Sequence, residues 1–455
     1  MDSQLPAGPR SPRAVQTLQW LTGSHRLMDH CGREFGDVFT VRMLPAAITG
    51  PGARARDGEW VFLAAPELVK QVFTAPPEAV LTGPTNRFLE GVVGPRSILV
   101  LDEPEHMVQR KLLLPHFHGE RVEAYRALIA EVTRAELASW PVGEELKLWP
   151  RMQAITLEVI VRAVFGITDL DRRQRMETIL RDLLNRFTSA RWVLWSTAVA
   201  LAKHGRAQVE ERAADARARA LGPVDEAILE EIRLRRDGDL SARDDILSLL
   251  MQSRYEDGSP LSDEELRDEL ITLLIAGHES TATMLAWSFE RLLRHPAMLA
   301  RLQEEAAAGE DAYADAAVKE TLRLRPVLPV VLRELVEPME LGGHELPAGT
   351  WVAPCAYLIH RRPDIYPDPL RFRPERFLEQ PAGTYSWMPF GGGVRRCAGA
   401  AFAQLEMREV LQTVTSALDL RSGGSRPERM RPRFITLAPS RGARAIVRRR
   451  APAAG

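Results

Sequence analysis

The sequence predicts a mainly α-helical protein with a smaller set of β-strands. Apolar residues at helical spacing cover most of the middle of the chain, and residues 266–294 are apolar on nearly every side of a helix. Short runs typical of strands occur at residues 38–43 and 60–63, near the N-terminus. A glycine-rich stretch, residues 388–399, directly precedes another helical pattern, and the elements before it are expected to be arranged around it.

The N-terminal part alternates helices, strands and one long irregular stretch. Residues 38–43 and 60–63 are expected to pair as strands, because a polar, glycine-containing loop joins them. Residues 74–101 contain many prolines and glycines and are predicted to be a loop, and a loop of this length usually covers or forms a binding site. Helices are predicted at residues 15–33 and 66–73.

The middle of the chain is predicted to be helical, apart from one apolar stretch. Residues 192–202 are too short to span a bilayer, and we interpret them either as ordinary core or as a mobile roof over a buried pocket. Residues 208–236 are densely charged and interrupted by Gly-Pro, which predicts a pair of solvated surface helices. Further helical patterns cover residues 121–140, 155–165 and 172–187.

The helix over residues 266–294 carries the clearest local signals. Ser262 followed by Glu265 is the pattern of a helix start in which the two residues cap each other. A helix of roughly 30 residues is ~45 Å long, so one that is apolar all round must cross the core of a large domain. Gly277 costs about 1 kcal/mol inside a helix, and Glu279 costs more if it is buried without partners. Two such costs side by side favour a functional site over a helix kink with a satisfied glutamate.

The C-terminal half combines one helix with several short strands. Residues 312–324 have a helical pattern in which Glu320 and Arg323 form an i, i+3 pair, which alone is commonplace. Residues 363–383 are rich in proline and are predicted to be irregular. Strands are predicted at residues 327–332, with an interruption at Pro329, at residues 351–356, and at residues 434–437 paired with residues 445–448.

The glycine-rich stretch ends in a cysteine that stands at a helix start. Three glycines, residues 391–393, allow the backbone to approach a bulky group, and Cys397 lies just before the helical pattern of residues 400–418. Exposed N–H groups and the helix dipole favour a thiolate there. A thiolate is a nucleophile, a zinc ligand or a haem ligand, whereas a thiol would be a small buried residue. Cys31 and Cys355 are isolated, so the spacing does not favour structural zinc.

The stretch follows the pattern Phe-x-x-Gly-x-Arg-x-Cys-x-Gly, which resembles the haem-binding loop of the cytochrome P-450 superfamily, the haem-thiolate monooxygenases. The resemblance implies that Cys397 binds the haem iron as a thiolate, which favours O–O cleavage. Gly391 and Gly399 would let backbone N–H groups point at the sulfur and tune it. Phe390 would shield the sulfur from water, and Arg395 would bind a haem propionate.

Two further segments resemble the same superfamily and occur in the expected order. His106 and Arg110 lie on one helix face, four residues apart, and match the pair that holds the propionates in relatives. Arg333 is a further propionate candidate, so at least three positive charges are expected against two propionates. Glu279 and Ser280 match the acid–alcohol pair that relays protons during oxygen activation. Ser280 departs from the pattern, because threonine is usual there.

A fourth segment of the superfamily is the buried ion network that Arg376 would complete with Glu320 and Arg323. Buried charges need such closure, and breaking one costs several kcal/mol. The resemblance implies a single haem domain over residues 1–455, with residues 1–14 flexible. Its fold would be mainly α with a smaller β-rich lobe, and haem b would lie between the long central helix and the cysteine loop.

Composition and charge restrict the setting. The net charge of −1 and the isoelectric point of about 6.8 do not suggest a nucleic-acid partner. We see neither an apolar run of roughly 18 residues nor a signal peptide, and three scattered cysteines suit a reducing compartment. We therefore expect a cytoplasmic, bacterial-type protein without a membrane span, monomeric and belonging to secondary metabolism.

The resemblance also implies an activity and its partners. One atom of O2 would enter an apolar substrate, such as a fatty acid, terpenoid or macrolide-like molecule, by hydroxylation or epoxidation, because the candidate pocket segments are mainly apolar. Electrons from NAD(P)H would arrive through a separate ferredoxin or flavodoxin and its reductase, which would dock weakly on the basic face near Arg395, Arg396 and Cys397.

Two other classes of protein share the cysteine loop. One is a haem-thiolate peroxygenase or isomerase that does not use O2, and such relatives typically lack the acid–alcohol pair at Glu279 and Ser280. The other is a non-catalytic haem sensor, which needs an output module for which we see no spare segment. Turnover with peroxide alone would favour the first alternative, and gas binding without NAD(P)H consumption would favour the second.

Overall fold

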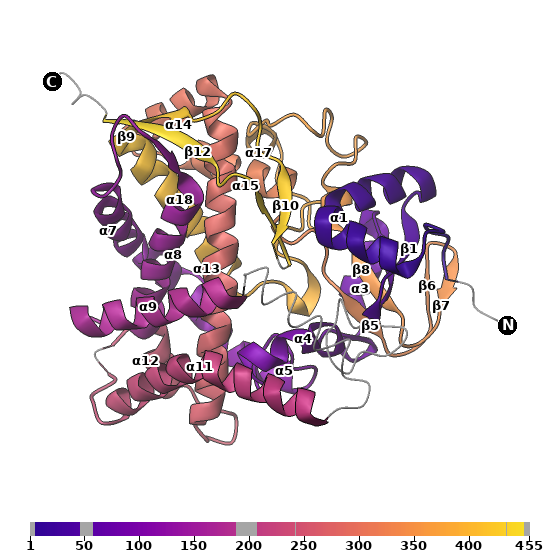
Figure 1. Ribbon diagram of the computed structural model, residues 1–455, viewed down its shortest axis with the longest axis horizontal. Coiled ribbons are helices and arrows are strands. Elements are labelled where there is room, and N and C mark those ends of the chain that lie inside the picture. The colour runs from indigo at the N-terminus through magenta and orange to yellow at the C-terminus, as the bar shows by residue number, and fades with distance from the viewer. Residues whose placement is uncertain (1–4, 46–57, 188–206, 242, 434, 450–455) are drawn as a thin grey trace.

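The computed structural model describes residues 5–45, 58–187, 207–241, 243–433 and 435–449 of the chain. Helices make up most of the described structure, and a β-rich lobe lies beside α1 (Arg13–Phe35), as Figure 1 shows. The prediction of a mainly α-helical fold with a smaller β-rich region is confirmed. Within the described residues, no helix is both long enough and apolar enough to cross a membrane.

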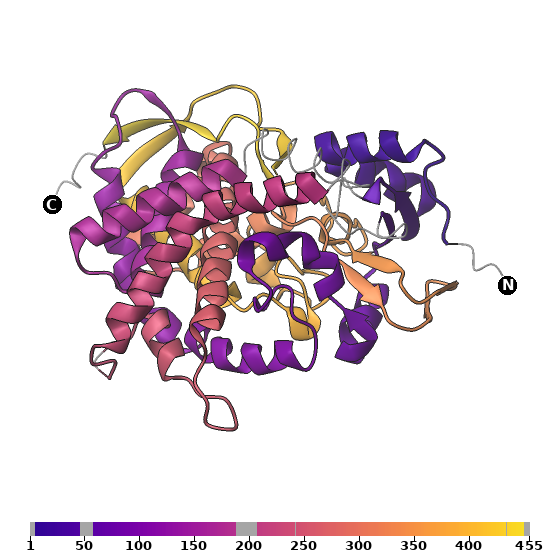
Figure 2. The same cartoon turned by 60° about the horizontal axis from the view of Figure 1, so that its bottom comes forward.

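A long central helix, α13 (Asp263–Leu293), passes through the middle of the molecule (Figures 1 and 2). Its 31 residues correspond to about 46 Å. The predicted start is confirmed, because the Ser262 side chain accepts a hydrogen bond from the backbone of Glu265 and the Glu265 carboxylate accepts one from the backbone of Ser262. α13 is buried along most of its length by α8 (Leu148–Phe165), α15 (Ala312–Leu324) and α18 (Ala400–Ala417).

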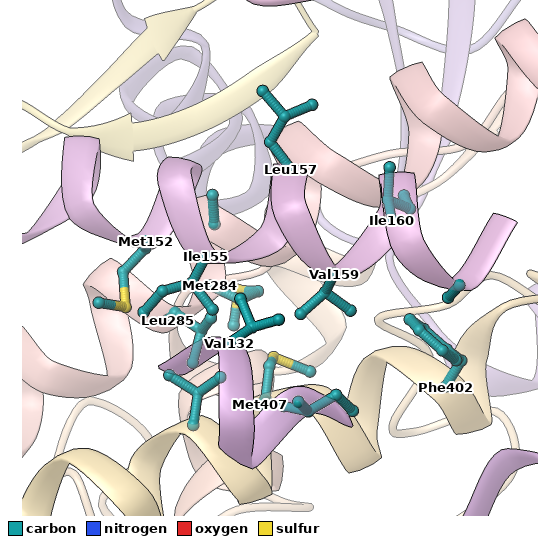
Figure 3. Packing of buried hydrophobic residues seen from close by; sticks show 14 of the residues in the cluster. Val132, Met152, Ile155, Leu157, Val159, Ile160, Met284, Leu285, Phe402 and Met407 are labelled. Atoms are coloured by element: carbon teal, nitrogen blue, oxygen red, sulfur yellow. The ribbon is translucent and has the colours of Figure 1, made fainter. Parts of the chain in front are cut away.

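The main hydrophobic core lies between α13 and these neighbouring helices. Figure 3 shows side chains from α7 (Arg126–Leu137), α8 and α18 meeting those of α13. Buried apolar area of this kind contributes roughly 25 cal/mol per Å² to folding, so this core fixes α13 and α18 relative to each other. The residues labelled there are Val132, Met152, Ile155, Leu157, Val159, Ile160, Met284, Leu285, Phe402 and Met407.

The β-rich lobe is built on a mixed five-stranded sheet in the order β1-β2-β8-β5-β3. β1 pairs antiparallel with β2, as predicted, and β2 pairs parallel with β8 with Trp60 opposite Trp351. The sheet therefore joins the N-terminal strands to segments nearly 300 residues later. Its strands are β1 (Val38–Arg42), β2 (Glu59–Leu63), β3 (Val80–Leu81), β5 (Arg333–Leu335) and β8 (Trp351–Pro354), and α3 (Pro66–Thr74) packs nearby.

The remaining elements are short or peripheral. A three-stranded sheet has the order β4-β12-β9, and two hairpins are formed by β6–β7 and β10–β11. The helical elements are η1 (Pro77–Ala79), α4 (Gly83–Val93), α5 (Glu105–Leu113), η2 (Leu114–Phe117), α6 (Glu120–Ala124), α9 (Leu170–Phe187), α11 (Ala207–Arg236), α12 (Ile246–Gln252), α14 (Pro296–Ala308), α16 (Ala356–Ile359), α17 (Arg376–Glu379) and η3 (Gly393–Arg395). The strands are β4 (Glu145–Lys147), β6 (Met339–Leu341), β7 (His344–Leu346), β9 (Leu418–Ser422), β10 (Met430–Arg433), β11 (Thr436–Pro439) and β12 (Arg444–Arg449).

A helix, α4, replaces much of the loop predicted over residues 74–101. Pro84 lies in its first turn, where the missing N–H of proline costs little. Asp102 caps the helix from a distance, because its Oδ1 accepts hydrogen bonds from the backbone N–H of Thr82 and Gly83 at 2.8 and 2.9 Å. The loop prediction is wrong here because the prolines and glycines mark the ends of a helix and the cap comes from a later residue.

The charged stretch over residues 208–236 forms one helix, α11, and not the predicted pair of solvated helices. Pro223 lies inside the helix on its exposed side. Leu221, Val224 and Ile228 are buried on the opposite side, where α11 packs on α9 and α13. Tertiary packing thus keeps the helix continuous across a residue that would end an isolated helix.

Two strand predictions are also corrected. Residues 327–332 are not a strand, and the strand begins directly after them as β5, since Pro329 cannot donate to a sheet. Within the described residues, the predicted pairing of residues 434–437 with residues 445–448 is not found: β11 pairs with β10, whereas β12 pairs with β4 and β9. The hairpin β10–β11 is therefore a separate unit from the terminal sheet.

The described part of the N-terminus differs from the expected flexible segment. The backbone N–H of Thr40 donates to the carbonyl of Ala7 at 3.0 Å, and its hydroxyl donates to the carbonyl of Pro6 at 2.7 Å. Pro6 and Ala7 are thus held against β1, and the carbonyls of Pro9 and Ser11 accept from Gln16 of α1. The interpretation of the apolar stretch 192–202, like that of the loop before β2 up to residue 57, falls outside the described residues and stays a prediction.

Candidate functional site

The glycine-rich loop is pressed against the end of α3. Gly391 and Gly393 have φ values of 67° and 64°, in the left-handed region that glycine adopts without strain. A Cβ atom on Gly392 would lie 2.3 Å from the ring of Phe73, and one on Gly393 would lie 2.5 Å from its carbonyl oxygen. The glycines are required by this close packing. The loop is closed by the backbone N–H of Cys397, which donates to a carbonyl seven residues earlier at 3.0 Å.

Cys397 ends this loop with its thiol in an unusual environment. The residue is accessible although protein atoms surround it on many sides, whereas Cys31 and Cys355 are fully buried. Burial raises the pKa of the Cys397 thiol, while the backbone N–H of Gly399 and the guanidinium of Arg110 lower it. The start of α18 three residues later adds the favourable end of a helix dipole. This set of donors suits a thiolate that binds a soft metal centre.

The neighbours of the thiol lie where the loop pattern predicts. Phe390 supplies the carbonyl that accepts from the backbone of Cys397, and its ring lies 6.1 Å from that of Trp387. Gly399 caps α18 and directs its N–H towards the sulfur. Gly391 makes the first left-handed turn of the loop. The structure thus keeps all of these predicted residues at one loop.

One face of the central helix is also accessible inside the fold. Ala276 is exposed although most of α13 is buried, and Leu273, Gly277 and Ser280 are half-buried. These positions lie at i, i+3, i+4 and i+7, so they form one face. Because α13 packs directly on α18, the accessible face and the cysteine loop belong to neighbouring elements. Such accessible surfaces on core elements fit a large group held inside the protein.

The predicted cations gather at the same place. The guanidinium of Arg333 is buried, and its Nη1 donates to the carbonyl of Leu332 at 2.7 Å. Arg110 donates through Nη2 to the carbonyl of Arg396, also at 2.7 Å. Among the described residues, neither Arg333 nor Arg110 forms an ion pair with a carboxylate. Burial lowers the pKa of Arg333 to about 10, which leaves it charged at neutral pH. A buried cation of this kind fits an anionic group, such as a haem propionate.

Arg395 has a carboxylate partner that the sequence did not reveal. Its Nη2 lies 2.8 Å from Oδ1 of Asp102, the residue that also caps α4, and its Nη1 donates to the carbonyl of Ile98 at 3.3 Å. Asp102 therefore joins the cysteine loop to α4. In the sequence, Asp102 is marked only by its position at the end of a long irregular stretch. That position does not predict which residue Asp102 binds.

His106 is brought to the cluster but does not add a charge. Its side chain is buried, and Nδ1 lies 2.7 Å from a carboxylate oxygen of Glu103. Burial, followed by the nearby positive charge of Arg395, lowers the pKa of His106 to about 4. The imidazole is therefore neutral at pH 7 and donates its proton to Glu103. Without His106, three arginines remain for two propionates, and one of them, Arg395, is already paired with Asp102.

Glu279 and Ser280 point to different partners. The Ser280 hydroxyl donates to the carbonyl of Ala276 at 2.6 Å. Glu279 accepts from Nε2 of Gln153 at 2.9 Å, and its other oxygen lies 3.1 Å from Nε of Arg433. Burial raises the pKa of Glu279, whereas Arg433 and Gln153 lower it. The carboxyl group is thus buried but well supported.

Two of these partners were missed by sequence analysis. Arg433 comes from β10, and its guanidinium lies 4.2 Å above the ring of Trp149, while Gln153 comes from α8. Neither lies near Glu279 in the sequence, so no local signal could have identified them. Gly277 also has a packing role, because a Cβ there would lie 2.5 Å from Cδ1 of Ile160. The glycine therefore permits close contact of α13 with α8.

The predicted ion network is present and buried. Glu320 and Arg323 both have fully buried side chains and form two hydrogen bonds of 2.7 and 2.8 Å. Arg376 joins them with its Nε 3.5 Å from Oε1 of Glu320. His360 extends the network to the cysteine loop, since Arg323 donates to its carbonyl and its Nε2 accepts from the backbone of Met388.

Comparison with solved structures identifies the fold. Solved structures of the same fold include a retinoic acid-bound cyanobacterial CYP120A1, with a TM-score of 0.79 and 22% identity over 98% of this chain and all of that chain. The cytochrome P450DA haem domain has a TM-score of 0.80 and 23% identity over 98% of each chain. At this level of identity, the likeness defines the fold.

Sequence comparison identifies the family. The cytochrome P450 family model matches residues 6–444. Putative cytochrome P450 135B1 of Mycobacterium tuberculosis is 39% identical over 451 residues, 98% of this chain and 91% of that protein. Putative cytochrome P450 137 of the same organism is 37% identical over 96% of this chain and 90% of that protein. The chain belongs to the cytochrome P450 family and is therefore an oxidoreductase, a haem-thiolate monooxygenase.

Proposed function

We propose that Cys397 would hold haem b by binding its iron as a thiolate, and that residues 1–455 form one haem domain. The observation that carries this assignment is the accessible Cys397 thiol, held by a glycine loop at the start of α18. When bound, haem supplies the activation of O2 and the transfer of one oxygen atom to a C–H or C=C bond. The protein supplies the thiolate, the charges that hold the group, and the protons.

The arginines of the cluster would bind the haem propionates. Arg110, Arg333 and Arg395 come from three separate elements and provide charge-assisted hydrogen bonds. Arg395 donates through Nη2 to Asp102 and through Nη1 to the carbonyl of Ile98, so a propionate would share this guanidinium with the contacts that hold α4. His106 acts through Glu103 and shapes this site without contributing a charge.

Glu279 and Ser280, on the central helix α13, would carry out the proton transfers. The Ser280 hydroxyl lies on the accessible face of α13 and can turn its proton from the Ala276 carbonyl towards the space above that face. Glu279 takes up protons at its carboxyl group, which is held by Arg433 and Gln153. Proton delivery thus requires two transfers, one at the Glu279 carboxyl group and one at the Ser280 hydroxyl.

The substrate is an apolar molecule such as a fatty acid, terpenoid or macrolide-like compound. Support comes from the half-buried apolar side chains of Leu273 and Ile275 on α13 and of Val330, Val331 and Leu332 before β5. All five of these side chains are apolar, so hydrophobic contact would provide most of the affinity for the substrate.

Electrons from NAD(P)H reach the protein through a separate ferredoxin or flavodoxin with its reductase. Arg396 and Val394 are exposed in the cysteine loop, and Val108 and Lys111 are exposed on α5, which contacts the loop through Arg110; Lys111 lies 3.3 Å from the exposed Glu256. Exposed basic and apolar side chains of this kind suit a weak, electrostatic encounter with an acidic carrier.

The test replaces Cys397 with alanine and uses Cys355→Ala as the matched control. We expect Cys397→Ala to lose the red-shifted Soret band of the reduced carbon monoxide complex, since that band requires a thiolate ligand. Cys355 is fully buried elsewhere, and its variant should keep the band. A Cys397→Ala protein that keeps the band would overturn the assignment. Product formation with O2 and NAD(P)H, compared with peroxide alone, then separates a monooxygenase from a peroxygenase.

A further inference from the structure

The segment between α4 and α5, residues 94–102, forms turns but no helix or strand, and we call it the strap. Its backbone bonds directly to side chains of α13. The backbone N–H of Arg96 donates to Oδ2 of Asp268 at 3.0 Å. Two residues later, the backbone N–H of Ile98 donates to Oε1 of Glu269 at 2.9 Å. Neighbouring carboxyl groups of the central helix thus take up these two strap N–H groups.

Two further contacts fix the strap on α13. The hydroxyl oxygens of Ser97 and Thr272 lie 2.6 Å apart, and both residues are buried. Gly94 begins the strap with a φ of 88°, and a Cβ atom there would lie 2.0 Å from Oδ1 of Asp268. Glycine is the residue that allows this conformation and this close approach together. The strap therefore has a well-defined position against the central helix.

The strap also holds Arg395 of the cysteine loop. Nη1 of Arg395 donates to the carbonyl of Ile98 at 3.3 Å, and Nη2 donates to Oδ1 of Asp102 at 2.8 Å. Within the described ranges, both terminal nitrogens of Arg395 bond to the strap and to no other segment. Ile98 thus connects two sites, because its N–H bonds to Glu269 of α13 and its carbonyl bonds to the guanidinium.

Glu269 is an unfavourable choice if the contact only stabilises the fold. Its side chain is fully buried, and Oε2 has no hydrogen-bond partner among the described residues. Burial raises the pKa of Glu269 to about 8, so its carboxyl group is mostly protonated and neutral at pH 7. A buried polar group with an unsatisfied oxygen costs free energy that an apolar side chain would not cost. This cost points to a role for the hydrogen bond that Glu269 accepts from Ile98.

We propose that Glu269 is a positioning residue which, through the strap, holds Arg395 where its guanidinium meets a haem propionate. The inference rests on the proposed function, in which Arg395 binds that propionate. Without the bond to Glu269, the Ile98 peptide could turn, and Arg395 would lose one of its two fixed acceptors. A cation held close to the haem also favours the ferrous state, because reduction adds one negative charge.

The experiment compares Glu269→Leu with the parent holoprotein in two assays. The first measures the rate of haem transfer to an excess of apomyoglobin, which should rise about tenfold because part of a charge-assisted hydrogen bond is lost. The second measures the ratio of ferric to ferrous protein at a fixed ambient potential. This ratio should rise about threefold as the guanidinium moves away from the haem. Parent values in either assay would overturn the proposal.

A conservative variant and a matched control separate positioning from general loosening. Glu269→Gln keeps an oxygen that accepts from Ile98 and, like the protonated acid, carries no charge, so it should keep the parent's values. Equal shifts in Glu269→Gln and Glu269→Leu would contradict the role of this hydrogen bond. The control is Glu264→Leu, because Glu264 is exposed on the same helix. If the control moved as far as Glu269→Leu, the effect would not belong to the strap and the proposal would fail.

A double-mutant cycle shows whether Glu269 acts through Arg395. In an Arg395→Gln background, Glu269→Leu should accelerate haem transfer by less than about twofold, because the group that it positions is already gone. Independent effects would multiply and refute the proposal. Should Glu269→Leu yield no holoprotein, Ser97→Ala takes its place. It loosens the same strap and should accelerate haem transfer about threefold, and a parent rate in Ser97→Ala would then be decisive against the proposal.

The carbon monoxide spectrum keeps this inference separate from the proposed function. All of these variants retain Cys397 and should keep the red-shifted Soret band of the reduced carbon monoxide complex. Absence of that band in the parent would refute the assignment of Cys397. Parent values in Glu269→Leu with the band intact would refute only the role of Glu269 and the strap.

Discussion

Replacing Glu320 with alanine would leave a buried arginine without its carboxylate. Glu320 accepts two hydrogen bonds from Arg323, and its Oε1 also accepts from the backbone N–H of Arg373 at 2.8 Å. Arg376 adds a further positive charge at 3.5 Å. Alanine would remove the negative charge on which all of these groups depend.

The expected cost follows from the burial of this network. Breaking a buried ion pair by removing one partner costs about 3–5 kcal/mol. The carbonyls of His360 and Pro369 remain bound to Arg323 at 2.6 and 2.8 Å and reduce this cost. The orphaned N–H of Arg373 adds about 1 kcal/mol. We therefore expect a loss of roughly 4 kcal/mol, against a total stability of about 5–15 kcal/mol for a typical protein.

A matched control lies on the same helix. Asp315 and Lys319 form an i, i+4 ion pair whose side chains are more than a quarter exposed. Asp315→Ala should cost at most about 1 kcal/mol, because solvent screens such pairs. The assay is urea unfolding of each holoprotein, with circular dichroism as the signal that reports the folded fraction. Since a chain of this length does not always unfold in two states, the midpoints are compared and not the extrapolated free energies.

The reasoning is refuted if the two midpoints coincide. A stable, haem-replete Glu320→Ala protein would mean that α15 does not bury its ion pair. The variant Glu320→Gln keeps the shape and one acceptor, so it should fall between alanine and the parent.

Three further predictions concern the proton groups and buried histidines. Ser280→Ala should release more hydrogen peroxide per NAD(P)H consumed and yield less product, with substrate binding nearly unchanged; equal coupling would mean that Ser280 is only a helix residue, and Ser280→Thr should couple at least as well as the parent. Arg433→Leu removes a favourable charge and should raise the pKa of Glu279, so the limb of the pH–rate profile that reports this group moves to higher pH; an unmoved limb contradicts the pairing. Burial lowers the pKa of His278 and His360 to about 3, below the unfolded value of about 6.5. Because the unfolded chain therefore binds more protons, the urea midpoint should fall as pH drops from about 6.5 towards 4. A midpoint that does not change with pH over this range would disprove the prediction.

The elements that the sequence predicts well carry their own local signals. α13 is announced by the Ser262–Glu265 capping pair and by apolar residues on all sides. The cysteine loop is announced by consecutive glycines, because no other residue fits against Phe73. In each case the residues that cause the structure lie within one segment of the chain. Sequence analysis therefore identified these segments without knowledge of their neighbours.

The parts that it missed depend on partners far along the chain. α4 is capped by Asp102, about 20 residues later. Glu279 is held by Arg433, which lies more than 150 residues away and belongs to a hairpin whose pairing was predicted incorrectly. The neutral state of His106 results from burial and from Arg395, and neither can be read from its helix. Patterns within a segment cannot supply such information.

The middle of α13 owes its unusual composition to α8. Three consecutive residues of α13 contact α8 positions that descend by three or four residues, so the two helices run in opposite directions at this point. The contacts are a close approach at the glycine, a hydrogen bond of 2.8 Å at the histidine and one of 2.9 Å at the glutamate. The pairs are Gly277 with Ile160, His278 with Thr156, and Glu279 with Gln153.

In this arrangement, the side of α13 that holds the Glu279 carboxyl group differs from the accessible side on which Ser280 lies. α8 and Arg433 hold Glu279 on the supported side, while Ala276 and Ser280 remain on the accessible side. Neighbouring residues of a helix point about 100° apart, so the Glu279 carboxyl cannot reach the accessible face without leaving Arg433 and Gln153. Proton delivery from Glu279 therefore requires either this rotation or a chain of water molecules. Arg433→Leu distinguishes the two: it should speed delivery if rotation limits turnover and slow it if a fixed carboxyl group orders the water.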